Sequence, residues 1–375
     1  MLIERLLGVA VYAGLLLVMY LAVRSAKNYT SLCRILNTYV VLLCVMAFFY
    51  IPERSADLYR WREVFVEYGW ADQSFSEFFD GQLIRTSTPI AYLYMYLINL
   101  TGIKGLLPAF CTLVFCGNAF YILKDLYRRH QVSARSISVA LFFLMAGGGF
   151  LEVISGVRCF VSLSILARCF YDELFNDKPI LKNIIWEGLA ALIHSMAAVL
   201  LVGRLLFTLI QKNRRPVEKV VNIVLTAAIV LFVFQFGVDY IVAALSKAEY
   251  YATNDDGYTF FWEYLIGAIV MFQFAFVLLK VRRTSKRMPE QHGMRNLIRF
   301  NLALFAVELV LAFEYNMFHR LIMFSTLTMT PLTAVAVDDP HNRGLNRMIW
   351  LLSILVLFLA CARGNMSGYK FILFQ

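Results

Sequence analysis

Long apolar runs separated by short polar linkers follow one another along the whole chain. Many runs are about 15 to 20 residues long, which suits α-helices that cross a bilayer core of roughly 30 Å. The pattern predicts an all-α polytopic integral membrane protein with about 11 to 13 hydrophobic helices. The apolar segments are 6–23, 36–51, 89–101, 105–123, 137–151, 156–171, 184–193, 195–210, 220–246, 260–280, 298–313, 321–337 and 347–362.

Basic residues gather in four of the linkers, at 24–34, 124–135, 212–219 and 280–299. Because Lys and Arg in short loops stay on the cytoplasmic side, these linkers are predicted to lie inside. The N-terminus, the linker 52–88 and the C-terminus then lie outside. The charged residues of the outer linkers are not needed for this topology and call for another explanation.

Two apolar stretches must be broken if all four basic linkers are inside. The stretch 89–123 makes one net crossing, and its first part ends at Thr101-Gly102. The stretch 184–210 starts and ends inside, with a break near His194. Such short or broken pairs are typical of re-entrant segments, which are tolerated where they line a cavity.

The longest outer linker, 52–88, mixes charged and aromatic residues. Between Leu58 and Tyr68 the apolar side chains recur at helical spacing, which predicts an amphipathic helix lying at the membrane interface. The linker around Asp255 and Asp256 repeats the mixture. These aromatic residues fit an interfacial belt. Rings beside carboxylates also suit sugars, which stack on rings and hydrogen-bond to carboxylates.

Composition supports one membrane domain over residues 1–375. Hydrophobic residues make up 60% of the chain and charged residues 16%, against about 25% charged in soluble domains. The mean hydropathy is +0.67. The net charge of +10 is placed beside helix ends and points to lipid headgroups, not to nucleic acid. The seven cysteines lack metal-ligand spacing, so no metal site is expected.

Three residues combine charge or proton chemistry with a place at a helix start or break. Arg158 follows Gly156 at the start of an apolar helix, where backbone N–H groups already favour an anion. Arg320 opens another helix from the same outer side. Guanidinium groups bind phosphate in a bidentate way and stay charged. His194 lies at membrane depth, where an ionisable group suggests function. Each residue also has a purely structural explanation. Arg158 could contact lipid headgroups or pair with Glu152, and Arg320 could pair with Glu314. His194 could hydrogen-bond to a backbone carbonyl freed by the helix break.

Asp57 and Glu53 are candidate bases in the outer linker. Arginines at 54, 60 and 62 lie close enough to neutralise them in an ordinary surface helix. The chain carries no P-loop, dinucleotide fingerprint, HExxH or nucleophile elbow. Nucleotide binding, zinc proteolysis and serine hydrolase chemistry are therefore not indicated.

A series of short motifs, in order, resembles the EpsG-like branch of the Wzy-type polysaccharide polymerases. The motifs are Asp57-Leu58-Tyr59-Arg60, Thr88-Pro89-Ile90, Gly156-Val157-Arg158-Cys159-Phe160, Ile193-His194-Ser195 and His319-Arg320-Leu321 before Pro331. The resemblance covers most of the chain. Two positions depart from the pattern: Cys159 replaces the usual Gln, and Thr88-Pro89-Ile90 replaces Glu-Pro-Gly.

This resemblance implies a GT-C-like architecture of the polymerase and ligase type. It implies a metal-independent glycosyltransferase with no cofactor, in the bacterial cytoplasmic membrane, with its active site on the periplasmic or extracellular side. The substrate would be an oligosaccharide repeat unit on undecaprenyl pyrophosphate, for capsule, exopolysaccharide or O-antigen synthesis. Membrane lipid, a flippase and chain-length regulator proteins are the implied partners.

Roles follow for the candidate residues. Arg158 and Arg320 would bind the pyrophosphate, and His194 would be the base or a third phosphate contact. Asp57 would be the alternative base or a sugar contact. The remaining glycan contacts would be Tyr59, Arg60, Asp255 and Asp256.

Three other functions remain open at this point. A ligase of related fold would use the same donor and a different acceptor. A glycosyltransferase that uses a monosaccharide on polyprenyl phosphate would usually have an acidic motif in its first outer loop. A transporter or flippase would need a continuous polar path and inverted repeats, and the sequence favours it least.

Overall fold

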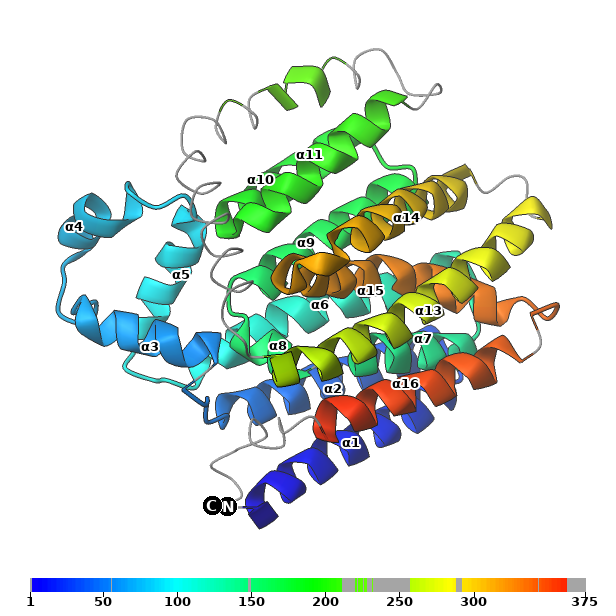
Figure 1. The fold of residues 1–375 in the computed structure, drawn as a ribbon, viewed down its shortest axis with the longest axis horizontal. Helices are drawn as coiled ribbons and strands as arrows, with labels where there is room; N and C mark the ends of the chain where they lie inside the picture. Colours follow the sequence, from blue (N-terminus) through cyan, green and yellow to red (C-terminus); the bar gives the residue numbers. More distant parts are fainter. Residues whose placement is uncertain are drawn as a thin grey trace.

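A computed structural model describes residues 2–54, 56–147, 150–210, 257–287, 292–342 and 344–362, and a few residues between 220 and 231. In these parts of the chain every regular element is helical (Figure 1). The protein is an all-α polytopic membrane protein, as its hydrophobic pattern predicts.

Five of the described helices are long and apolar enough to cross a membrane. They are α1 (Leu2–Arg24), α2 (Tyr29–Phe48), α6 (Leu106–Arg129), α13 (Gly257–Arg287) and α15 (Tyr315–Asp338). Further apolar helices are α7 (Ala134–Gly147), α9 (Cys159–Phe170), α10 (Ile184–Ile193), α11 (Ser195–Ile210), α14 (His292–Val310) and α16 (Leu345–Ala362). The helices run roughly parallel to one another as a bundle (Figure 1).

Helix α15 forms the centre of the bundle and packs against α7, α9, α13 and α14. Protein buries 89% of its apolar stretch, against 33% for α1, so α1 offers far more of its surface to lipid. Two buried hydroxyls of α15 have hydrogen-bond partners on α14. Thr328 donates to Asn301 Oδ1 at 2.7 Å, and Ser325 donates to Glu308. The hydroxyls therefore join α14 to α15 at membrane depth, where water cannot replace such bonds.

Both predicted breaks are present. Helix α5 (Pro89–Asn99) is about 16 Å long, roughly half a bilayer, and ends in a turn where Gly102 has a φ of +67°. Helices α10 and α11 meet at His194 and pack side by side as a hairpin (Figure 1). Helix α10 also contacts α5. The two broken segments therefore meet inside the protein.

The outer linker folds into α3 (Asp57–Glu67), α4 (Phe75–Phe78) and the π-helix η1 (Phe79–Leu83). With α5, α3 and α4 form a cap at one end of the bundle, here called the loop end (Figure 1). A capping box joins Ser74 and Glu77 at the start of α4, and the hydrogen bond from the Ser74 side chain lowers the pKa of Glu77. The capping box thus satisfies backbone groups at the start of α4.

The amphipathic helix is confirmed, but its apolar face meets protein rather than lipid. Leu58, Trp61 and Phe65 are buried, whereas Tyr68 is 48% exposed. The Phe65 and Trp70 rings lie 4.9 Å apart, and Trp61 meets Tyr92 edge-on at 5.5 Å. The placement of this helix at the membrane interface stays a prediction. Its aromatic side chains build the core of the cap.

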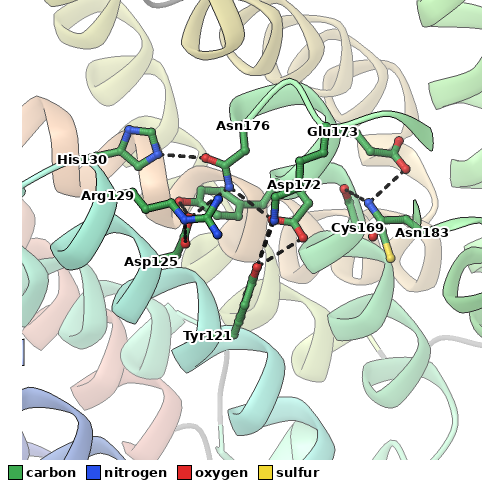
Figure 2. Close-up of polar contacts among 11 residues, drawn as sticks. Tyr121, Asp125, Arg129, His130, Cys169, Asp172, Glu173, Asn176 and Asn183 are labelled. Carbon is green, nitrogen blue, oxygen red and sulfur yellow. Dashed lines mark hydrogen bonds and ion pairs between the residues drawn. The ribbon is translucent and has the colours of Figure 1, made fainter. Parts of the chain in front are cut away.

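A polar network joins α6 to the π-helix η2 (Tyr171–Phe175), which continues α9 (Figure 2). Asp125 accepts hydrogen bonds from Tyr171 and Asn176, each at 3.0 Å, and its other oxygen pairs with Arg129 at 2.8 Å. Asn176 also bonds to His130. Each of these charged groups is paired or hydrogen-bonded. Such partners lower the free-energy cost of burying a carboxylate.

Candidate functional site

The site is built around the start of α9, where a short irregular segment follows α8 (Phe150–Ser155). The carbonyl of Val157 accepts hydrogen bonds from the Tyr94 hydroxyl at 2.5 Å and from the Cys111 thiol at 3.4 Å. Arg158 is the next residue and caps α9. Helices α5 and α6 thus fix the backbone that carries this arginine.

The Arg158 side chain is held by the cap. Its guanidinium lies 4.4 Å from the centre of the Trp61 ring, and Nη1 is 3.5 Å from the hydroxyl of Thr88. A guanidinium over an indole gains about 0.5 to 2 kcal/mol and remains free to bind an anion at its edge. Arg158 therefore stacks on an aromatic ring, while Glu152, its expected alternative partner, pairs with His319.

His194 is buried between α10 and α11, with 8% of its surface exposed. Its Nδ1 accepts a hydrogen bond from the backbone N–H of Met196 at 3.1 Å. A neutral ring with Nδ1 as acceptor carries its proton on Nε2, so that atom is a donor. The charges of Arg158 and Arg320 both act on this imidazole. The broken segment therefore places His194 within electrostatic reach of the two arginines.

Arg320 completes the cluster from the first turns of α15, where it is half-buried. The thiol of Cys159 lies within electrostatic reach of Arg320, Arg158 and Asp57. Asp57 is the first residue of α3, where a negative charge is favoured by the helix dipole. Four predicted site residues from four separate segments thus gather around the start of α9. Two guanidinium groups and one imidazole donor, beside one carboxylate, suit a doubly charged anion that carries a polar substituent.

Two of the other predicted glycan contacts, Tyr59 and Arg60, lie on α3. Arg60 is exposed on α3, opposite the face that buries Trp61, and Tyr59 is half-buried. Asp255 and Asp256 lie outside the described residues. Their role in binding sugar stays a prediction.

Residue spacing does not reveal several groups that the fold brings to the site. Trp61 and Thr88 hold Arg158, and Glu152 lies 3.7 Å from His319, measured from Oε2 to Nε2. In the sequence, Glu152 is a possible partner that precedes the Arg158 motif, and His319 opens the His319-Arg320-Leu321 motif. Neither signal pairs them, because α8 and α15 are far apart in the chain.

We expect Gly156→Ala to disrupt this arrangement. A Cβ at Gly156 would lie 2.5 Å from the Phe160 ring and 3.0 Å from the Glu152 carbonyl, so the segment before Arg158 must shift. Since a displacement of 1 Å can cost on the order of 100-fold in rate, any activity that depends on Arg158 should fall by about that factor. Gly188→Ala is the matched control, because nothing lies within 4 Å of its added Cβ. Equal activity of the two variants would contradict the expectation.

Comparison with known protein families shows to which family the chain belongs. The EpsG family matches residues 33–374, nearly the whole chain, and this range includes the positions of the four clustered residues. The chain belongs to the EpsG family. EpsG proteins are Wzy-like polysaccharide polymerases, so the resemblance drawn from the short motifs is confirmed. No curated protein and no solved structure matches this EpsG chain. The GT-C-like architecture accordingly stays a prediction.

Within the described part of this EpsG chain, no group of three or more His, Cys, Asp or Glu side chains is arranged to hold a metal ion. Positive charge in the site comes from Arg158 and Arg320. Cys159, which replaces the usual Gln, is buried beside them and provides a thiol where an amide would donate hydrogen bonds. Metal-independent transfer remains the expectation for the reaction.

Proposed function

We propose that this EpsG-family protein polymerises oligosaccharide repeat units carried on undecaprenyl pyrophosphate. The donor is a growing chain on the lipid, and the acceptor is a single lipid-linked repeat unit. The observation that carries the proposal is the convergence of Arg158, Arg320 and His194 at the start of α9. These side chains come from three different segments and share one property, the donation of hydrogen bonds to an anion.

The physical need of such a transfer is to stabilise the leaving pyrophosphate. Its negative charge grows as the bond to the anomeric carbon breaks, and fixed donors aimed at that charge are usually the largest catalytic contribution. The stacking of Arg158 on Trp61 fixes the guanidinium before substrate binds. The helix start adds backbone N–H groups that also favour an anion.

The geometry favours one of the two roles expected for His194. Its Nδ1 is engaged by the Met196 N–H, so Nε2 is left to donate to a phosphate oxygen. A third positive charge beside Arg158 and Arg320 would be unfavourable, which also argues for a neutral donor. Asp57, at the start of α3, is assigned to a glycan hydroxyl next to the pyrophosphate.

The loop end is proposed to face the outside of the cytoplasmic membrane. The four basic linkers then remain inside, and the repeat unit reaches the site after a flippase has delivered it. A chain-length regulator is the second proposed partner. The product is capsule, exopolysaccharide or O-antigen.

The test uses purified protein in lipid nanodiscs and the undecaprenyl-pyrophosphate-linked repeat unit that accumulates in a strain lacking this polymerase. We expect a ladder of products spaced by one repeat unit, resolved by gel electrophoresis. Products extended only when a different acceptor is added would indicate a ligase. Failure to form polymer with this substrate would contradict the proposal.

A further inference from the structure

A carboxylate and an imidazole face each other at the edge of the cationic cluster. Glu152 Oε2, on α8, lies 3.7 Å from His319 Nε2, on α15, and the two side chains are 38% and 27% exposed. The Tyr315 ring stacks on the imidazole with 5.6 Å between ring centres and an angle of 26°. The imidazole is thus fixed in orientation, with one nitrogen turned toward the carboxylate.

This pair borders the proposed pyrophosphate site. The charge of Glu152 acts on the same Cys159 thiol that senses Arg158 and Arg320. His319 directly precedes Arg320 in the chain, and Glu152 lies in the short helix that leads into Arg158. A carboxylate so close to the leaving-group site is well placed for an acceptor hydroxyl.

His319 also lines a small cavity. The cavity has a volume of about 40 Å³ and is lined by His319, Tyr315, Glu263 and parts of α7, α13 and α15. A cavity of this size with polar groups in its wall has room for water. A proton that arrives at His319 therefore has a path away from the reacting atoms.

On the basis of the proposed function, we propose that Glu152 is the general base of the transfer and that His319 relays the proton away from it. The acceptor oxygen forms a bond with the anomeric carbon as the bond from that carbon to the pyrophosphate oxygen breaks. The electron pair leaves with the pyrophosphate. The acceptor proton moves to Glu152, then to His319 Nε2, and then to water in the cavity.

Asp57 and His194 are the rival bases, and the contacts separate their roles from that of Glu152. His194 uses Nδ1 to bond Met196 and donates with Nε2, whereas Glu152 faces an imidazole that can accept a proton. Asp57 lies on α3 in the cap, where its charge acts on Tyr94 and Cys159. That position suits contact with a sugar.

The experiment measures polymerisation of the lipid-linked repeat unit in nanodiscs and binding of undecaprenyl pyrophosphate by native mass spectrometry. Glu152→Gln is expected to lower kcat by about 10²- to 10⁴-fold, with little change in KM or lipid binding. His319→Gln should also lower kcat more than it raises KM.

The double variant should be no slower than Glu152→Gln, because the effects on rate of residues that act as one unit do not add. Glu67→Gln, an exposed carboxylate at the end of α3, is the matched control.

Outcomes separate the two proposals. Wild-type protein that makes no polymer contradicts the polymerase function itself. If the wild type polymerises and Glu152→Gln is fully active, the base assignment is overturned. It is also overturned if Asp57→Asn loses about 10²- to 10⁴-fold in kcat while Glu152→Gln does not. If Glu152→Gln unfolds at a lower temperature, Glu152→Ala with added formate decides the question. Recovery of rate supports a base at this position, and no recovery overturns it.

Discussion

Replacing Arg158 with lysine is expected to lower the rate of chain elongation by about 10²- to 10³-fold, the usual cost of losing one donor to a developing anion. Lysine keeps the charge but loses the planar, bidentate group that stacks 4.4 Å from Trp61 and reaches Thr88. Elongation is measured as the length distribution of products from the lipid-linked repeat unit. Membrane insertion should not change, because the site lies at the end of the bundle and the spanning helices are untouched.

Arg24→Lys is the matched control for this substitution. Arg24 ends α1, is exposed, and bonds Tyr20 at 3.2 Å, far in the fold from the start of α9. Its variant should give polymer of normal length. Normal polymer length from Arg158→Lys would remove the pyrophosphate role from Arg158.

Replacing Arg204 with methionine is expected to lower the free energy of unfolding by about 3 to 5 kcal/mol, the usual cost of breaking a buried ion pair. Arg204 on α11 forms an ion pair with Glu173 of η2, and their side chains are 1% and 0% exposed. Methionine fills a similar volume but leaves the carboxylate without its guanidinium. Unfolding of the purified protein in mild detergent, followed by intrinsic fluorescence, measures the loss.

A double variant isolates the buried charge as the cause. Glu173→Gln removes the charge and keeps an oxygen for Asn183, which donates to Glu173 Oε1 at 3.2 Å. Arg204→Met combined with Glu173→Gln should recover much of the stability lost by Arg204→Met alone. If the double variant is as unstable as the sum of the single variants, the loss comes from packing and not from the uncompensated charge.

Much of the site follows from local features of the chain. Arg158 and Arg320 each stand at the start of an apolar helix, and His194 interrupts an apolar run, so hydrophobic pattern alone singles them out. The positive-inside rule predicts that the segment broken at His194 turns back, and the α10–α11 hairpin has this shape. Spacing also predicts the buried face of α3, because periodicity reports which residues share a side.

Periodicity does not report what that shared side meets. Leu58, Trp61 and Phe65 would suit lipid or protein equally well, since both are apolar, and only the fold shows that they pack within the cap. For the same reason the pair of Glu152 with His319 is invisible in the sequence. Each residue alone resembles an ordinary charged group near a helix end.

The sequence by itself determined the helical membrane architecture, the broken segments and the membership of the EpsG family. These properties depend on hydrophobic length, loop charge and short motifs, all of which are local along the chain. Tertiary structure alone decided that Arg158 stacks on Trp61 and that Glu152 faces His319. Such contacts join segments distant in sequence, and their geometry is set by how the helices pack.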